Sequence, residues 1–311
     1  MSPTRPTVVP AVLVIALLVA TAAAFVVSER LKLTPSPILD TQVDRSFSPI
    51  CSCPTAIARL SFRLRKADRL TIAVVKADSV VRNLVRSRRF GPGVVGSAWN
   101  GREDGGRLAP DGSYLIRVHL AHARRTIVLP NPITLDTRAP RAELVAIRPR
   151  RFSPDGDHRA DRVEISYRFD EAARPYLLID GRVRVIGRFA YRSGQLTWYG
   201  KVGSTVFPAG RYRISVAGRD LAGNLSAPAP AKTVEIRFIA LARHTISAAP
   251  GRRLEVSVST DALRFHWRFA GRSGTALVRR PLALRAPTRP GRYRLTVSER
   301  GHSAQALITI R

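Results

Sequence analysis

The sequence predicts an all-β protein in which three tandem β-sandwich domains follow one N-terminal transmembrane helix. Three observations predict this: a segment recurs along the chain, apolar and polar residues alternate in short runs, and no helical apolar stripe follows residue 33. Short alternating strands with turn residues at regular spacing are typical of β-sandwiches. We therefore divide the chain as follows: 1–28 anchor or signal segment, 29–45 linker, and sandwiches at 46–140, 141–240 and 241–311.

The N-terminal segment carries no charge from Val8 to Val27. Its 20 residues match the length that a helix needs to cross a bilayer. We expect a single-pass anchor in the cell membrane, with the C-terminal domains extracytoplasmic. The alternative is a signal segment that is cleaved near Ala24, after a run of small residues, which leaves a secreted protein. Pro35 and Pro37 then predict an extended, non-helical linker.

The recurring segment marks the domains. The first copy opens at Phe47-Ser48-Pro49 and ends at Pro110-Asp111-Gly112-Ser113-Tyr114, and the second runs from Phe152-Ser153-Pro154 to Pro208-Ala209-Gly210-Arg211-Tyr212. A reduced third copy ends at Pro290-Gly291-Arg292-Tyr293. Proline and glycine turn the chain before each tyrosine, so we expect the ring to be buried and its hydroxyl to bond to nearby backbone. Trp99 and Trp198 are expected in the same cores.

Alternation is clearest in the strands that follow these openings. The run Val163–Phe169 places Val163, Ile165, Tyr167 and Phe169 on one face, and Phe265, Trp267 and Phe269 alternate in the same way near the C-terminus. Each pattern predicts a half-buried strand.

Several of these residues resemble a known family. Phe152-Ser153-Pro154-Asp155-Gly156-Asp157-His158-Arg159-Ala160-Asp161-Arg162-Val163 resembles the opening of the immunoglobulin-like (Ig-like) domain of the bacterial flagellar hook-capping protein. Trp99–Arg107 with Pro110–Tyr114 is similar to its second half, and the Asp220–Asn224 turn resembles the closing hairpin of bacterial Ig-like repeats. The resemblance covers about 47–140 and 141–240 and fades in 241–311. It implies an Ig-like fold, which is a reusable module, and no flagellar role.

The net charge of +30 is the compositional anomaly. Such a field attracts polyanions, and runs at Arg148/Arg150/Arg151, Arg124/Arg125 and Arg279/Arg280 favour an anionic envelope polymer as partner. The alternative is compositional: arginine codons of a GC-rich genome fill solvent-facing strand positions. Nucleic acid is not favoured, because aromatic residues make up 7% and none interleaves with the basic runs.

The one candidate metal site is the turn that holds Asp155, Asp157 and Asp161. Three carboxylates and the bend at Gly156 suit Ca²⁺, which takes six to eight oxygen ligands. The alternative is that Asp155 and Asp157 cap the turn through backbone hydrogen bonds while Asp161 meets an arginine. The twelve-residue loop of an EF-hand is absent.

Catalytic motifs are missing from the sequence. It has no Gly-x-Ser-x-Gly, no His-Glu-x-x-His and no phosphate loop, so we predict no enzyme, no other cofactor and no small-molecule substrate. Cys51 and Cys53 are either free or closed into a small disulfide ring, and their spacing is not that of a structural zinc site.

The predicted function is therefore non-catalytic: a membrane-anchored extracytoplasmic spacer, adhesion or envelope-polymer-binding module. One alternative is an accessory subunit that docks on an envelope enzyme or machine by strand-edge pairing. Another is a cryptic hydrolase, which requires a perturbed carboxylate pair or a Ser/His contact in a cleft.

Overall fold

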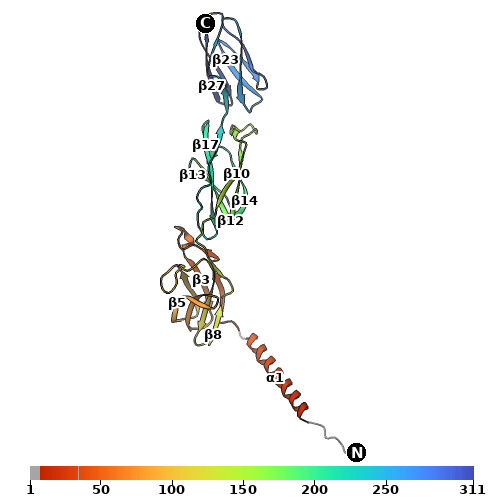
Figure 1. Cartoon of the computed structure of the whole chain (residues 1–311), viewed down its shortest axis with the longest axis vertical. Coiled ribbons are helices and arrows are strands. Elements are labelled where there is room, and N and C mark those ends of the chain that lie inside the picture. The colour runs from red at the N-terminus through yellow and green to blue at the C-terminus, as the bar shows by residue number, and fades with distance from the viewer. Residues whose placement is uncertain (1–7, 34) are drawn as a thin grey trace, which may run out of the picture. The chain divides into compact units, whose positions relative to one another are not determined.

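The computed structural model describes residues 8–33 and 35–311, which form one α-helix followed by strands and a short 3-10 helix (Figure 1). The chain divides into two compact units. Unit 1 comprises Met1–Ser46 and Ile57–Leu135, and unit 2 comprises Phe47–Ala56 and Asp136–Arg311. Each unit has its own sheets and its own buried residues.

The N-terminal helix α1 spans Val8–Leu33. A membrane crossing needs about 20 consecutive, predominantly apolar helical residues. Within the residues that the structure describes, no helix combines the required length with the required hydropathy. This finding overturns the predicted single-pass anchor and the cell-membrane localisation that was built on it.

Unit 1 is a sandwich of two antiparallel sheets. One sheet has the order β1-β3-β6 and the other includes the order β9-β7-β4-β5, with β8 paired to β7. The strands are β1 (Ile38–Val43), β3 (Ala58–Leu64), β4 (Asp68–Lys76), β5 (Ser79–Phe90), β6 (Gly93–Trp99), β7 (Gly112–Leu120), β8 (Arg125–Val128) and β9 (Ile133–Leu135). Alternate residues of β3 and β7 are buried, as half-buried strands require. Because Ile38 is buried and pairs with Leu64, part of the predicted linker at 29–45 is a strand of this sandwich.

Unit 2 begins with a segment that precedes most of unit 1 in sequence. β2 (Ser46–Phe47) leads into it and the short helix η1 (Pro54–Ala56) closes it. The next strands are β10 (Ala142–Arg148), β11 (Arg151–Phe152), β12 (Val163–Ile179), β13 (Arg182–Ile186), β14 (Tyr191–Trp198), β15 (Lys201–Val202), β16 (Thr205–Val206), β17 (Gly210–Asp220) and β18 (Lys232–Ile236).

The long strand β12 serves both layers of this second sandwich. Its first part, up to Phe169, pairs with β10 and β14, and its part after Ala173 pairs with β13 and β17. β12 thus takes the place of two consecutive strands of an Ig-like domain, with no loop between its two parts.

A third sandwich completes unit 2. Its strands are β19 (Ile239–Leu241), β20 (Thr245–Ala248), β21 (Arg253–Val256), β22 (Val258–Thr260), β23 (Arg264–Phe269), β24 (Arg272–Leu277), β25 (Leu282–Arg285), β26 (Gly291–Glu299) and β27 (His302–Ile310). The main sheet has the order β20-β27-β26-β23-β24. Unit 2 contains two hydrophobic clusters, one drawn from 144–238 and one from 239–310.

The three tyrosines of the recurring segment form the predicted corner bond, although only the ring of Tyr114 is fully buried and those of Tyr212 and Tyr293 are half-buried. Tyr114, Tyr212 and Tyr293 each donate their hydroxyl to the backbone carbonyl four residues earlier. Trp99 and Trp198 are fully buried, with ring centres 4.8 Å from Tyr114 and 5.9 Å from Tyr212. The sheets are antiparallel except at the pairs β11–β18 and β20–β27. Two-layer, mostly antiparallel sheets with this corner are typical of Ig-like sandwiches, so the predicted Ig-like fold is confirmed.

Candidate functional site

The turn between β11 and β12 brings the three predicted calcium ligands together. Oxygens of Asp155, Asp157 and Asp161 lie within 4.8 Å of one another. Backbone N–H groups hold the turn: those of Gly156 and His158 donate to Asp161 at 2.8 and 2.7 Å, and that of Asp157 donates to Asp155 at 3.2 Å. Asp161 therefore meets backbone donors instead of the expected arginine. Capping fixes the aspartates and leaves lone pairs free on their oxygens.

A fourth carboxylate approaches this turn from the third sandwich. Glu299, the last residue of β26, is only 7% exposed, and its carboxyl lies within hydrogen-bonding reach of that of Asp155. Its Oε2 atom is buried and receives no hydrogen bond from any donor that the structure describes. Its Oε1 atom lies 3.5 Å from Arg300 Nε. Burial, and then the facing Asp155, raise the pKa of Glu299 well above its usual range.

Asp261 is a fifth carboxylate at the same place. Both of its oxygens are buried and accept no well-formed hydrogen bond, although its own backbone N–H and the Ser153 hydroxyl lie close to them. The nearby Ser153 hydroxyl donates to Asp155 at 3.2 Å. Burial raises the pKa of Asp261 to about 6; its own backbone N–H opposes this shift, and the charges of Asp155 and Asp157 add to it.

The carboxyls of Asp155 and Glu299 lie closer together than the catalytic carboxyls of a glycosidase do. Asp155 lines a surface groove of about 940 Å³ with Tyr199, Lys201 and Arg162. Glu299 is buried behind it, and the two carboxyl groups are close enough to share a proton. Glycosidases hold their catalytic carboxyls about 5 Å apart or more, on opposite sides of the substrate.

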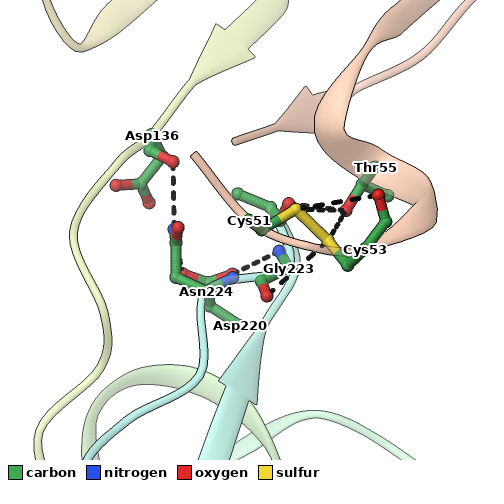
Figure 2. Close-up of a disulfide and its surroundings, with 8 residues drawn as sticks. Cys51, Cys53, Thr55, Asp136, Asp220, Gly223 and Asn224 are labelled. Atoms are coloured by element: carbon green, nitrogen blue, oxygen red, sulfur yellow. Dashed lines mark hydrogen bonds between the residues drawn. A yellow bond between two sulfur atoms is a disulfide. The ribbon is translucent and has the colours of Figure 1, made fainter. Parts of the chain in front are cut away.

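A second carboxylate group lies elsewhere in unit 2, and several hydrogen bonds converge on one of its members. It consists of Asp136, Glu171 and Asp220. Asp220 is buried and accepts bonds from the backbone of Gly223 at 2.6 Å and from the backbone and side chain of Asn224, both at 2.8 Å (Figure 2). The Asn224 side chain also donates to the Asp136 carbonyl at 2.9 Å. These bonds make this group a structural turn.

The cysteine pair is also part of unit 2. Cys51 and Cys53 form a disulfide, which settles the alternative left open by the sequence. Thr55 beside it donates to the Ala222 carbonyl at 2.7 Å, and the disulfide packs on Gly223 (Figure 2). Gly223 has a φ of +107°, and a Cβ there would lie 2.4 Å from Cys53 Sγ. Glycine at this position thus permits both the turn and the close approach of the disulfide.

The third sandwich carries a groove that combines aromatic and cationic side chains. Its volume is about 710 Å³, and it runs between β23–β24 and the segment from β25 to the start of β26. Trp267 and Tyr293 line it in half-buried positions, together with Arg272, Arg285 and Arg289. No carboxylate is among the lining residues described. The wall is therefore positively charged, with two ring faces available for contact.

The predicted arginine runs do not form one patch within a unit. Arg124 and Arg125 lie at the β7–β8 turn of unit 1, whereas the other two runs belong to unit 2. Arg151 is engaged with Glu235, at 2.9 Å. The arginine runs that the sequence shows therefore do not mark one binding surface.

The segment Trp99–Arg107, which carried part of the family resemblance, covers an edge strand. The Asp104 backbone N–H donates to the Val81 carbonyl of β5 at 3.0 Å. Its carboxylate accepts bonds from the backbone and side chain of Asn83 at 3.1 and 2.6 Å. The bonds from Asn83 hold the pKa of Asp104 below its usual value. Covering an edge in this way blocks pairing with another chain there.

Comparisons with known proteins give fold neighbours of low similarity. No protein-family model matches the sequence, and no curated protein is significantly similar to it. Among solved structures, fibronectin(III)-like modules of Clostridium thermocellum CbhA are 16% identical, covering 63% of this chain and 93% of theirs (TM-score 0.34). Titin domains I67–I69, in an E-to-A variant, are 12% identical, covering 89% of this chain and 99% of theirs (TM-score 0.32).

A third neighbour is SGBP-B of a Bacteroides ovatus mixed-linkage glucan utilization locus, in complex with a heptasaccharide. It is 13% identical over 88% of this chain and 70% of its own (TM-score 0.22). Because these TM-scores lie below 0.5, what these proteins bind carries no argument about this chain. The specific resemblance to the hook-capping domain stays a prediction from its motifs.

Sequence reasoning missed Glu299, Asp261 and the aromatic groove. For Glu299 the pattern was present: it follows the buried Leu295 and Val297 at period two, and an acid at an inward position is unusual. Trp267 alternates with the buried Phe265 and Phe269 and packs against the same core while staying only half-buried, which alternation alone does not predict.

Proposed function

We propose that this protein is a non-catalytic binding module that holds an anionic polysaccharide in the groove of its third sandwich. The other two sandwiches act as spacers. The observation that carries the proposal is the lining of that groove: three arginines and two half-buried aromatic rings, with no carboxylate among the lining residues described.

Each group in the groove has a part in this binding. Arg272 and Arg289 offer charged, forked donors that match carboxylate or phosphate groups on a polymer. Arg285 is steadied by a bond from its Nε to the Gly251 carbonyl at 3.2 Å. Trp267 and Tyr293 offer apolar faces to sugar rings, and Tyr293 is fixed by its corner bond. The net charge of +30 raises the local concentration of any polyanion.

The test is binding of the full chain to polygalacturonate, compared with neutral dextran of similar length, in the presence of a chelator. Arg272→Gln and Arg289→Gln should each weaken binding to polygalacturonate several-fold. Arg268→Gln is the matched control, because Arg268 lies on β23 beside Trp267 but outside the groove. Equal binding of both polymers, or equal loss in the control, would refute the proposal.

Strand-edge docking remains a second candidate at one edge. β5 is covered by the Trp99–Arg107 segment, whereas β24 ends its sheet and pairs only with β23 among the described strands. A photo-crosslinker at Ser273, on β24, tests this. Capture of one stoichiometric protein favours docking, and capture of none leaves the polymer proposal in place.

A further inference from the structure

We propose that the second sandwich has a binding site of its own, in which a sugar ring of the anionic polysaccharide enters a groove between β14 and the loop that follows β13. This edge groove has a volume of about 460 Å³. The inference rests on the polysaccharide binding proposed above, and it gives the second sandwich a part beyond that of a spacer.

The edge groove opens at a side of the sandwich where neither layer continues. β13 and β14 belong to different layers, and each pairs only with β12 among the described strands. Pro175, Gly187 and Arg188 line the groove together with β14 residues such as Ser193 and Gly194. Sites for small ligands have volumes of about 300–1,000 Å³, so the edge groove is large enough for one or two sugar rings.

Two glycines allow close packing around the edge groove. Gly194 pairs with Tyr167 across β12 and β14, and a Cβ at Gly194 would lie 2.6 Å from the Tyr167 hydroxyl oxygen. A Cβ at Gly187 would lie 2.5 Å from Pro175 Cγ. Because Gly194 has no side chain, the Tyr167 ring lies against the backbone of β14 and reaches the groove.

The Tyr167 hydroxyl is the observation that points to a ligand. Tyr167 is only 4% exposed, and no hydrogen bond joins its hydroxyl to any group that the structure describes. Burying a hydroxyl without a partner is unfavourable, so a ligand that bonds to it in the groove gains affinity. Burial raises the pKa of Tyr167, and the nearby Tyr191 adds to this shift. The hydroxyl therefore stays neutral and can both donate and accept a hydrogen bond.

Exposed aromatic rings flank this hydroxyl. Phe189 and Tyr191 are 56% and 57% exposed, and their ring centres lie 6.2 Å apart. Exposed rings that gather in one place are typical of contact sites, and their faces suit the apolar face of a sugar ring. The Arg188 guanidinium lies 5.2 Å from the centre of the Phe189 ring and adds a positive charge at the rim.

The surrounding charge favours an anionic occupant. Residues 181–219 include no aspartate or glutamate, and β13 and β14 carry Arg182, Arg184 and Arg192. An acidic sugar matches both features, because its carboxylate can pair with arginine and its ring hydroxyls can bond to Tyr167. An acidic peptide has the same charge but no sugar ring, and the test distinguishes the two.

The test compares binding of the full chain to polygalacturonate and to poly-glutamate, a polyanion without sugar rings. Phe189→Ala and Tyr191→Ala should each weaken binding to polygalacturonate by about three- to tenfold and leave binding to poly-glutamate unchanged. Tyr199→Ala is the matched control, because Tyr199 is 48% exposed on the same sandwich but lies outside the edge groove. Equal losses for both polymers, or no loss in either ring variant, would overturn the proposal.

A second pair of variants separates a binding hydroxyl from a structural one. Tyr167→Phe should weaken binding to polygalacturonate by about threefold or more without lowering the melting temperature, because the hydroxyl has no described partner to lose. Tyr212→Phe makes the same change at a hydroxyl that donates to the Pro208 carbonyl at 2.7 Å. It should melt lower and bind as the parent does. A lower melting temperature in Tyr167→Phe with unchanged binding would show that this hydroxyl serves the fold alone.

The outcomes also separate the edge groove from the groove of the third sandwich. Weaker polygalacturonate binding in Arg272→Gln but not in Tyr191→Ala overturns the edge groove and leaves the proposed function standing. Weaker binding in Tyr191→Ala but not in Arg272→Gln keeps the edge groove and refutes the groove of the third sandwich as the polymer site. A parent protein that binds no polygalacturonate refutes both.

Discussion

The tyrosine corner should contribute unequally to the stability of the sandwiches, although its hydrogen bond is the same in each. Tyr114 is 1% exposed and donates to the Pro110 carbonyl. Tyr293 is half-buried and donates to the Arg289 carbonyl at 3.0 Å. Replacing either by phenylalanine keeps the ring and removes only the hydroxyl.

The expected magnitudes follow from burial. At Tyr114, water cannot readily replace the lost donor, so Tyr114→Phe should cost about 1–1.5 kcal/mol, the upper part of the range for one hydrogen bond. For a unit of roughly 100 residues this lowers the melting temperature by about 4–8 °C per kcal/mol. At Tyr293, water replaces the bond, and Tyr293→Phe should cost less than about 0.5 kcal/mol.

Urea unfolding of each variant, with amide exchange in β7 and β26 to assign the unit that is affected, measures these differences. Tyr114→Leu is the reference for losing the ring, which contacts Trp99 at 4.8 Å, and should cost about 2–4 kcal/mol. Equal small losses at Tyr114 and Tyr293 would show that the corner hydroxyl does not stabilise the fold through its bond.

Two further predictions concern single groups. Burial alone would raise the pKa of Asp68, but backbone N–H groups of His122, Ala123 and Arg69 lower it overall. The ionised Asp68 carboxylate therefore stabilises unit 1 at pH values above 3.8, its ordinary pKa. This contribution is lost as the pH falls through the lower pKa of the folded protein. Asp68→Asn should flatten acid unfolding below pH 4 and cost about 2 kcal/mol at pH 7; an unchanged acid profile would contradict this. Gly223→Ala should speed proteolysis within 47–56, because a Cβ there meets Cys53 at 2.4 Å, whereas Gly181→Ala, also at positive φ but in open space, should not; equal rates in both variants would count against packing of the disulfide on the turn.

The sequence was sufficient to predict the Ig-like fold because the patterns that indicate this fold are local. Period-two alternation in Val163–Phe169 and the repeated Pro-x-Gly-x-Tyr turns depend on neighbours a few residues apart, and the structure has the strands and the corners that these patterns predict. The extent of β12 was less predictable, since a strand that passes from one layer to the other without a loop has no turn residues to mark it.

The sites depend on contacts between distant segments, which local patterns do not encode. Glu299 meets Asp155 across 144 positions of sequence, and Thr55 meets Ala222 across 167. The aspartate turn was identifiable from spacing alone, but its two buried partners were not. The positive charge was visible in the composition, whereas the placement of Arg272, Arg285 and Arg289 in one groove depends on the fold of the third sandwich.

The salt dependence of polygalacturonate binding tests the account most directly. Binding through arginines releases counterions, so the logarithm of the binding constant should fall linearly with the logarithm of salt concentration. In an Arg272→Gln/Arg289→Gln double variant the slope should shrink by about one for each arginine removed, while Arg268→Gln keeps the slope of the parent. Binding that ignores salt, or a slope that is the same in all three proteins, would contradict a cationic groove as the binding surface.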